Sequence, residues 1–151
     1  MKQLDLLKPG KNPPNDINVI IEIPKGSNIK YEIDPETGAL SVDRKLSTAM
    51  YYPCNYGFIP KTLEGDGDPV DVLVLGDDPI VPLSVIRSQP IGILLTEDEE
   101  GLDSKIIATP STNIDPAFSR VVDINNIPEY IRHQIKQFFE HYKELEEGKL
   151  K

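Results

Sequence analysis

Fourteen prolines are spread along this chain of 151 residues, and they restrict its possible folds more than any other feature. Proline removes a backbone donor and is poorly tolerated inside helices and central strands. Its share here is about twice the usual roughly 5%. Because the prolines are dispersed, we expect many short segments joined by turns. Without a repeat or a break in composition, residues 1–151 are predicted to form one domain.

Short stretches rich in β-branched residues predict that most of these segments are strands. We expect strands at Ile17–Ile23, Lys30–Asp34, Ala39–Arg44, Val70–Leu75, Leu83–Arg87, Ile91–Leu95 and Lys105–Thr109. The segment "DPETG" at 34–38 predicts a turn that makes a hairpin of the second and third strands. Proline fixes one dihedral of such a turn, and glycine adopts a positive one.

One helix is predicted in "NNIPEYIRHQIKQFFEHYKELEEGK" near the C-terminus. Asn126 is the expected N-cap, Pro128 lies in the first turn, and Gly148 is the expected stop. Its apolar face is expected to contain Ile131, Ile135, Phe138, Tyr142 and Leu145. Strands followed by a helix predict an α+β fold, a small closed or partly closed antiparallel barrel with the helix outside.

Charge and composition exclude several classes of function. The net charge of -9 argues against nonspecific binding to nucleic acid or an anionic membrane. No apolar run approaches the roughly 20 residues of a membrane-spanning helix, and the N-terminus does not resemble a signal peptide. The one cysteine, Cys54, cannot form an internal disulfide, so we expect a cytoplasmic protein.

Three aspartates in "LEGDGDPVDVLVL", Asp66, Asp68 and Asp71, precede an apolar strand. A single acid would most simply be a solvated turn residue. Three carboxylates held together in a turn stiffened by proline must protonate, repel or share a cation. Oxygen ligands favour Mg²⁺, Mn²⁺ or Ca²⁺ over zinc. The spacing does not match an EF-hand, so a catalytic Mg²⁺ site fits better.

A second acidic segment, "TEDEEGLDSK" at 96–105, contains Asp98 and Asp103. On its own it predicts a solvated hairpin loop. It follows one expected strand and precedes another, so we expect it at one end of the barrel, where functional loops collect.

Charged and phenolic side chains lie within or beside the other strands. Lys30, Glu32 and Arg44 would be compatible with an exposed strand face, whereas Glu22 stands between two isoleucines. The tyrosines of "MYYPCNYGFIP" predict core packing or a phenol donor to an anion. Cys54 is expected to be a small buried residue, and no credible nucleophile is present. The inventory therefore predicts attack of metal-activated water on a phosphate.

Five segments, in order along the chain, resemble the family I soluble inorganic pyrophosphatases of bacterial type. They are "VIIEIPKGSNIKYEID", "GALSVDRKLSTAMYYPCNYGFIP", "DGDPVDV", "EDEEGLDSK" and "FFEHYKELEEGK". The resemblance implies a five-stranded OB-like antiparallel barrel with flanking helices. It also implies hydrolysis of pyrophosphate to two orthophosphates with several Mg²⁺ ions, or Mn²⁺ or other divalent cations, per active site.

The resemblance also implies a role for each matching residue. Asp68 would be the general base. The metal ligands would be Asp66, Asp71, Asp98, Asp103 and Glu22. Phosphate oxygens would be bound by Lys30, Arg44, Tyr56, Lys105, Tyr142 and Lys143, with Tyr56 also counted as catalytic. Glu32 would reach metal through water, and Tyr52 would support the edge of the site.

One departure from the family pattern and two rival functions accompany this interpretation. Family members usually continue into a further helix, whereas this chain ends at "EEGKLK", so that helix is expected to be absent or truncated. A homo-oligomer, a hexamer by resemblance, is expected with pyrophosphate as substrate. A glycosyltransferase with a DxD motif is usually larger. A noncatalytic OB module would need exposed aromatic residues and a basic groove.

Overall fold

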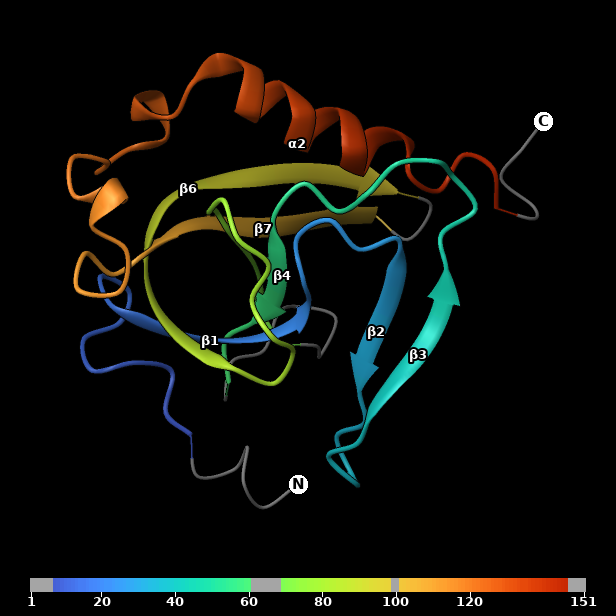
Figure 1. Ribbon diagram of the computed structural model, residues 1–151, viewed down its shortest axis with the longest axis horizontal. Helices are drawn as coiled ribbons and strands as arrows, with labels where there is room; N and C mark the ends of the chain where they lie inside the picture. The colour runs from blue at the N-terminus through green and yellow to red at the C-terminus, as the bar shows by residue number, and fades with distance from the viewer. Residues whose placement is uncertain (1–6, 61–68, 99–100, 147–151) are drawn as a thin grey trace.

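The computed structural model describes residues 7–60, 69–98 and 101–146, and of Asp98 the backbone alone. Five strands form a closed barrel (Figure 1). Their order is β1 (Ile17–Ile23), β4 (Asn55–Phe58), β5 (Asp71–Val74), β7 (Gly101–Pro110) and β6 (Val85–Asp98), and β6 pairs back onto β1. The expected α+β architecture and the number of barrel strands are confirmed.

One pair of barrel strands departs from the antiparallel expectation. β5 and β7 are parallel, with Asp71 opposite Lys105, while the other four pairs are antiparallel. The parallel pair arises because β6 does not lie between β5 and β7 in the barrel, although it does so in the chain. Closing the barrel in this order therefore brings two distant segments together in the same direction.

The strand between the first acidic turn and the hairpin was not predicted from the sequence. β4 has four residues and contains Gly57, which weakens any strand signal. A Cβ at Gly57 would overlap the carbonyl oxygen of Ile20 on β1. Glycine is therefore what allows β1 and β4 to approach.

The two strands expected at Leu83–Arg87 and Ile91–Leu95 are one strand, β6, of 14 residues. Its register with β7 shifts between Pro90 and Gly92. A bulge at this point accommodates the proline without ending the strand. The acidic segment at 96–105 is accordingly not a long loop, because β6 continues to Asp98 and β7 begins at Gly101.

A separate two-stranded sheet lies beside the barrel in Figure 1. It contains β2 (Ile29–Ile33) and β3 (Leu40–Lys45), which pair antiparallel as predicted. Gly38 in the turn between them has the expected positive φ, 78°, and the Asp34 carboxylate in addition accepts the Glu36 N–H at 2.8 Å.

The helix α2 (Glu129–His141) is shorter than predicted at both ends. Asn126 instead ends the 3-10 helix η2 (Ile124–Asn126), whose N-cap is Asp123, and Pro128 is the N-cap of α2. Ile127 precedes a proline and is extended, which prevents the helix from starting earlier. At the other end Tyr142 is the C-cap, and Gly148 lies outside the described residues.

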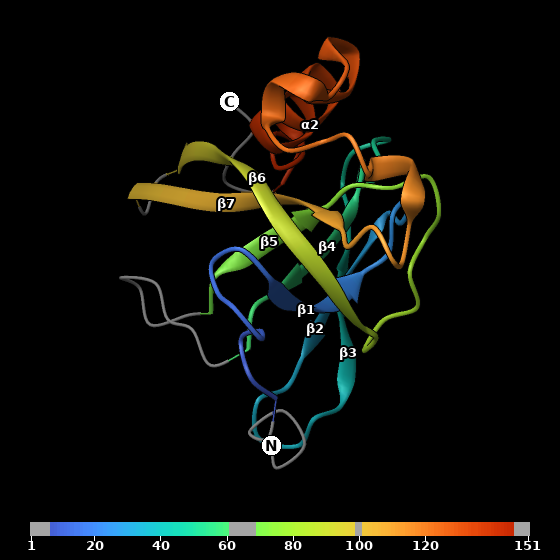
Figure 2. The same ribbon diagram turned by 90° about the vertical axis from the view of Figure 1, so that its left-hand side faces the viewer.

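Side chains on the two faces of β5 enter two different apolar clusters. Val72 and Val74 pack with Val19 and Ile21 of β1 and with other strand residues. Leu73 of β5, and Leu75 just beyond its end, pack in the same cluster as Ile135 of α2. This second cluster joins the helix to the outside of the barrel, and α2 lies over β6 and β7 in both ribbon views (Figures 1 and 2).

The predicted apolar face of α2 is partly confirmed. Ile135 and Phe138 are buried, whereas Leu145 lies beyond the helix and is 52% exposed.

A short 3-10 helix, η1 (Pro116–Phe118), completes the connection from β7. Within the described ranges, no helix is long and apolar enough to span a bilayer.

Candidate active site

The Lys105 side chain is the centre of the cluster that the barrel assembles. Lys105 pairs with Asp71 of the neighbouring parallel strand, and Asp103 lies two residues earlier on the same face of β7. The Lys105 Nζ lies 2.8 Å from Asp103 Oδ2, 3.4 Å from Asp71 Oδ2 and 3.3 Å from the Tyr56 hydroxyl. Three strands, β4, β5 and β7, thus bring four of the predicted site residues into contact.

Burial and charge act against each other in this cluster. Burial lowers the pKa of Lys105, but the Asp71 and Asp103 carboxylates outweigh it and hold that pKa above its ordinary value. Burial raises the pKa of Asp71, which Lys105 and the Tyr56 hydroxyl partly offset. Burial, and then the charge of Asp71, also raise the pKa of Tyr56. At neutral pH Lys105 is therefore a cation and Tyr56 a neutral donor.

Glu22 contributes a further carboxylate from β1. Its Oε2 accepts the Ile33 N–H of β2 at 3.0 Å. Burial, together with the charges of Asp71 and Glu32, raises the pKa of Glu22 to about 7, although the Ile33 N–H and Lys30 act to lower it. Glu22 therefore lies near other acids, although the Glu32 residue itself is exposed. A bound cation would relieve this repulsion.

The β2–β3 hairpin contributes two cations, both paired with acids that were not predicted. Arg44 Nη1 lies 2.9 Å from Asp43 Oδ2, and Arg44 Nη2 lies 2.7 Å from Glu146 Oε1. Lys30 Nζ lies 3.6 Å from the same Asp43 oxygen. Asp43 and Glu146 carry no sequence signal of their own, because isolated acids are usually exposed.

Five aromatic rings join the end of α2 to β4 and the preceding loop. They belong to Tyr52, Tyr56, Phe138, Phe139 and Tyr142, and their paired ring centroids are 4.7 to 6.5 Å apart. Burial raises the pKa values of Tyr52 and Tyr142. Lys143 Nζ lies 5.5 Å from the Tyr142 ring centroid. The cluster brings the C-terminal residues of the predicted site to the barrel.

Phe139 is a residue of this cluster that the sequence reasoning missed. The Lys105 Nζ lies 5.6 Å from the centroid of its ring. Helical spacing predicts that Phe138 lies on the apolar face of the helix, and it predicts no contact for the adjacent Phe139. The doublet of phenylalanines was the available signal, since two adjacent apolar residues face different neighbours on a helix.

Three predicted residues cannot be placed from the structure. Asp66 and Asp68 lie outside the described residues, and the side chain of Asp98 is not described. Among the side chains that are described, no group of three or more His, Cys, Asp or Glu residues is arranged to hold a metal ion. Asp71, Asp103 and Glu22 offer the hard oxygen ligands that suit Mg²⁺.

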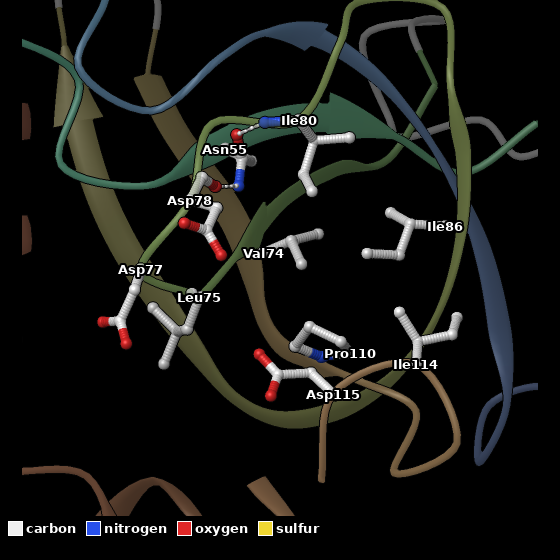
Figure 3. Close-up of a pocket in the computed structure, with 11 residues that line it drawn as sticks. Asn55, Val74, Leu75, Asp77, Asp78, Ile80, Ile86, Pro110, Ile114 and Asp115 are labelled. Carbon is white, nitrogen blue, oxygen red and sulfur yellow. Dashed lines mark hydrogen bonds between the residues drawn. The ribbon is translucent and has the colours of Figure 1, made fainter. Parts of the chain in front are cut away.

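The opposite end of β5 is organised by the buried amide of Asn55. Its Oδ1 accepts the N–H groups of Lys25 and Ile80, each at 2.9 Å, and its Nδ2 donates to the Asp78 carbonyl at 3.0 Å. Beside it lies a pocket of about 270 Å³ between Val74, Ile80, Ile86 and Ile114, with Asp77, Asp78 and Asp115 along one side (Figure 3). Asn55 therefore anchors β4 immediately before Tyr56.

Cys54 is buried as predicted, at 1% exposure. Burial raises its pKa to about 12, so the thiol does not ionise near neutral pH. A neutral, enclosed thiol is a poor nucleophile.

The model of the inorganic pyrophosphatase family matches residues 19–151. The chain belongs to the inorganic pyrophosphatase family. It is 62% identical to an inorganic pyrophosphatase of Aquifex pyrophilus over 143 residues, which is 95% of this chain and 81% of the relative. It is 59% identical to that of Sulfolobus acidocaldarius, again over 95% of this chain and 83% of the relative.

A solved inorganic pyrophosphatase from Helicobacter pylori has the same fold. Its TM-score is 0.90 at 49% sequence identity, over 94% of this chain and 83% of that one. The predicted pyrophosphatase family and enzyme class are therefore confirmed. Family membership also sets aside the glycosyltransferase and the noncatalytic OB module.

Proposed function

We propose that this protein hydrolyses inorganic pyrophosphate to two orthophosphates with Mg²⁺ as cofactor. The observation that carries the proposal is the match to the pyrophosphatase family over residues 19–151. The contacts among Asp71, Asp103, Lys105 and Tyr56 support it, because carboxylates and phosphate-binding groups lie together at one end of the barrel strands.

The acids divide into ligands and a base in this proposal. Asp66, Asp71, Asp98, Asp103 and Glu22 would hold the cations. Bound Mg²⁺ would neutralise the phosphates and lower the pKa of the attacking water. The Asp68 carboxylate would accept a proton from the attacking water, and Glu32 would act through an intervening water.

The cations and phenols bind the substrate. Lys30, Arg44, Lys105 and Lys143 pair with phosphoryl oxygens, and the phenols of Tyr56 and Tyr142 donate hydrogen bonds to them. Tyr52 is buried among the rings and supports the other two tyrosines. Mn²⁺ or another divalent cation could replace Mg²⁺, since the ligand set contains oxygen alone.

Two properties of the whole protein complete the proposal. We propose that the barrel is of the OB-like type, and that the protein is a cytoplasmic homo-oligomer, a hexamer by family resemblance. The pairing of β5 with β7, which are neighbours in the barrel but are separated by β6 along the chain, supports the first proposal.

The proposed reaction is tested by measuring phosphate release from pyrophosphate. Purified protein is expected to release phosphate with millimolar Mg²⁺, and phosphate release is expected to stop when a chelator is added. Folded protein that releases none with Mg²⁺ present would contradict the proposal.

The Asp68→Asn variant tests the role of the general base. We expect turnover to fall by about 100-fold or more, because the positioned proton acceptor is lost, while Mg²⁺ binding by calorimetry is mostly retained. Asp77→Asn, an exposed acid at the opposite end of β5, is the matched control and should keep normal turnover. Near-normal turnover of Asp68→Asn would remove Asp68 as the base.

A further inference from the structure

Among the described side chains of the candidate site, the Lys105 ammonium is the most enclosed charge, in a residue that is 5% exposed. Its three N–H bonds have three oxygen acceptors, on Asp103, Asp71 and Tyr56. In the proposed function, two of these acceptors also bind metal. If both carboxylates bound a metal ion, Lys105 would lose two of the three partners that hold its ammonium in place.

Two aromatic rings contact the same ammonium without using its hydrogen bonds. Nζ lies 5.4 Å from the ring centroid of Tyr56 and 5.6 Å from that of Phe139. Both distances are within the roughly 6 Å over which an ammonium is attracted to an aromatic ring. Tyr56 has a second task as a hydrogen-bond partner, whereas Phe139 has no polar atom and can act through its ring alone.

The ring of Phe139 is itself firmly held. Its centroid lies 5.0 Å from that of Phe138, 5.6 Å from that of Tyr142 and 6.2 Å from that of Tyr56. Because Phe138 is buried in the core, the helix that carries both residues fixes the ring against Lys105. A ring held in this way stays in place when the carboxylates of Asp71 and Asp103 change partners.

We propose that Phe139 is a positioning residue, whose ring keeps the Lys105 ammonium at the site after Asp71 and Asp103 have turned to metal. This inference rests on the proposed function. The two N–H bonds released by the carboxylates then point to phosphoryl oxygens of the substrate. Removing the ring should therefore weaken substrate binding more than turnover.

The contact can be measured without activity or metal. In NMR spectra of protein with ¹³C-labelled lysine, the ring currents of Tyr56 and Phe139 change the chemical shift of the Lys105 ε-CH₂ signal. This signal is assigned as the one that is missing from the spectrum of the Lys105→Arg variant. We expect Phe139→Leu to lose part of that shift in chelator, Phe139→Tyr to keep it, and wild-type protein to keep it when Mg²⁺ is added. A signal that Phe139→Leu leaves unchanged, or a shift that Mg²⁺ abolishes in wild-type protein, would overturn the proposal.

Kinetics with fluorinated rings separate electrostatics from packing. Replacing Phe139 by mono-, di- and trifluorophenylalanine weakens the negative face of the ring with little change of shape. We expect KM for pyrophosphate to rise with each added fluorine. In Phe139→Leu we expect KM to rise about 5- to 30-fold, with kcat changed less. Phe139→Tyr should remain within about two-fold of wild type, because its ring keeps the negative face.

Phe118 provides the matched control, since it is another partly buried phenylalanine, packed against the apolar cluster that joins α2 to the barrel. The same fluorinated series at Phe118 should leave KM unchanged. A flat series at Phe139, or an equal slope at the two positions, would overturn the positioning role. Wild-type protein that releases no phosphate would refute the proposed function instead, and the metal-free spectra would still decide the contact between Phe139 and Lys105.

Discussion

Glu22 shows how the fold turns an ordinary side chain into a group with unusual chemistry. In the sequence it is one acid within an apolar strand. In the fold its carboxylate is largely removed from water and bonded to the Ile33 amide of another sheet. Burial and the nearby charges of Asp71 and Glu32 raise its pKa to about 7. A group with this pKa takes up or releases a proton in the neutral range.

The raised pKa of Glu22 predicts a pH dependence of stability in chelator. The folded protein keeps this proton up to about pH 7, whereas the unfolded chain loses it near 4.5. Between these values the folded state binds more protons, so the Glu22 contribution to the free energy of unfolding falls as pH rises. Urea unfolding should therefore show Glu22→Gln gaining stability relative to wild type from pH 5 to pH 8.

Glu36→Gln is the control for this experiment, because Glu36 is an exposed carboxyl of the hairpin turn. Its stability relative to wild type should not change over the same range. If Glu22→Gln behaves in the same way as this control, the pKa of Glu22 is not raised by the fold.

Among the elements, β4 depends most directly on a single residue. It lies between β1 and β5 and contributes Tyr56 to the site. Gly57 occupies the point of closest approach to β1, where a side chain would collide with the Ile20 carbonyl. The position of Tyr56 therefore depends on a glycine with no chemistry of its own.

Gly57→Ala is expected to destabilise the protein by about 3 kcal/mol or more, because the backbones of β1 and β4 must move apart. The free energy of unfolding in urea measures this loss. Gly76→Ala is the matched control: a Cβ there meets nothing within 4 Å, so its effect should stay within about 0.5 kcal/mol. Equal stability of the two variants would contradict the close packing of β1 and β4.

At the scale of the whole molecule, the two ends of β5 have different roles. Acids, cations and phenols gather where β5 begins, and apolar side chains with the Asn55 amide close the other end. The barrel wall between them contains Val72, Leu73 and Val74, each fully buried. This rigid wall gives the charged residues a fixed support.

The outer surface of the β6–β7 hairpin has exposed apolar side chains, although the protein has a net charge of -9. Ile93, Leu95 and Leu102 are 57%, 71% and 85% exposed. Exposed apolar patches of this kind mark interaction surfaces. They are consistent with the proposed self-association.

Light scattering during gel filtration is expected to give about six times the mass of one chain. The Leu95→Glu variant should lower that mass, because charge would then have to be buried between copies. Val122→Glu, a substitution at another exposed residue, is the control and should leave the mass unchanged. A monomer in the wild-type protein would contradict the hexamer, and an unchanged mass in Leu95→Glu would exclude this surface.

The local elements could largely be predicted from the sequence. The strand at Ile17–Ile23 has the predicted bounds, Gly38 in the 34–38 turn has the predicted positive φ, and α2 lies within the predicted range. These features depend on neighbours along the chain: β-branched residues, a proline before a glycine, and helical spacing. Asp71, Asp103, Lys105 and Tyr56 were also named in advance, through the resemblance of their motifs to the pyrophosphatase family.

The tertiary structure alone decided how these pieces meet. The parallel β5–β7 pair, the close approach at Gly57, and the Asp43 and Glu146 partners of Arg44 join residues far apart in the chain or acids without a motif. The contact of Phe139 with Lys105 links a helix to a barrel strand. Periodicity and turn chemistry report local preference, whereas these contacts exist because closing the barrel leaves each side chain one set of neighbours.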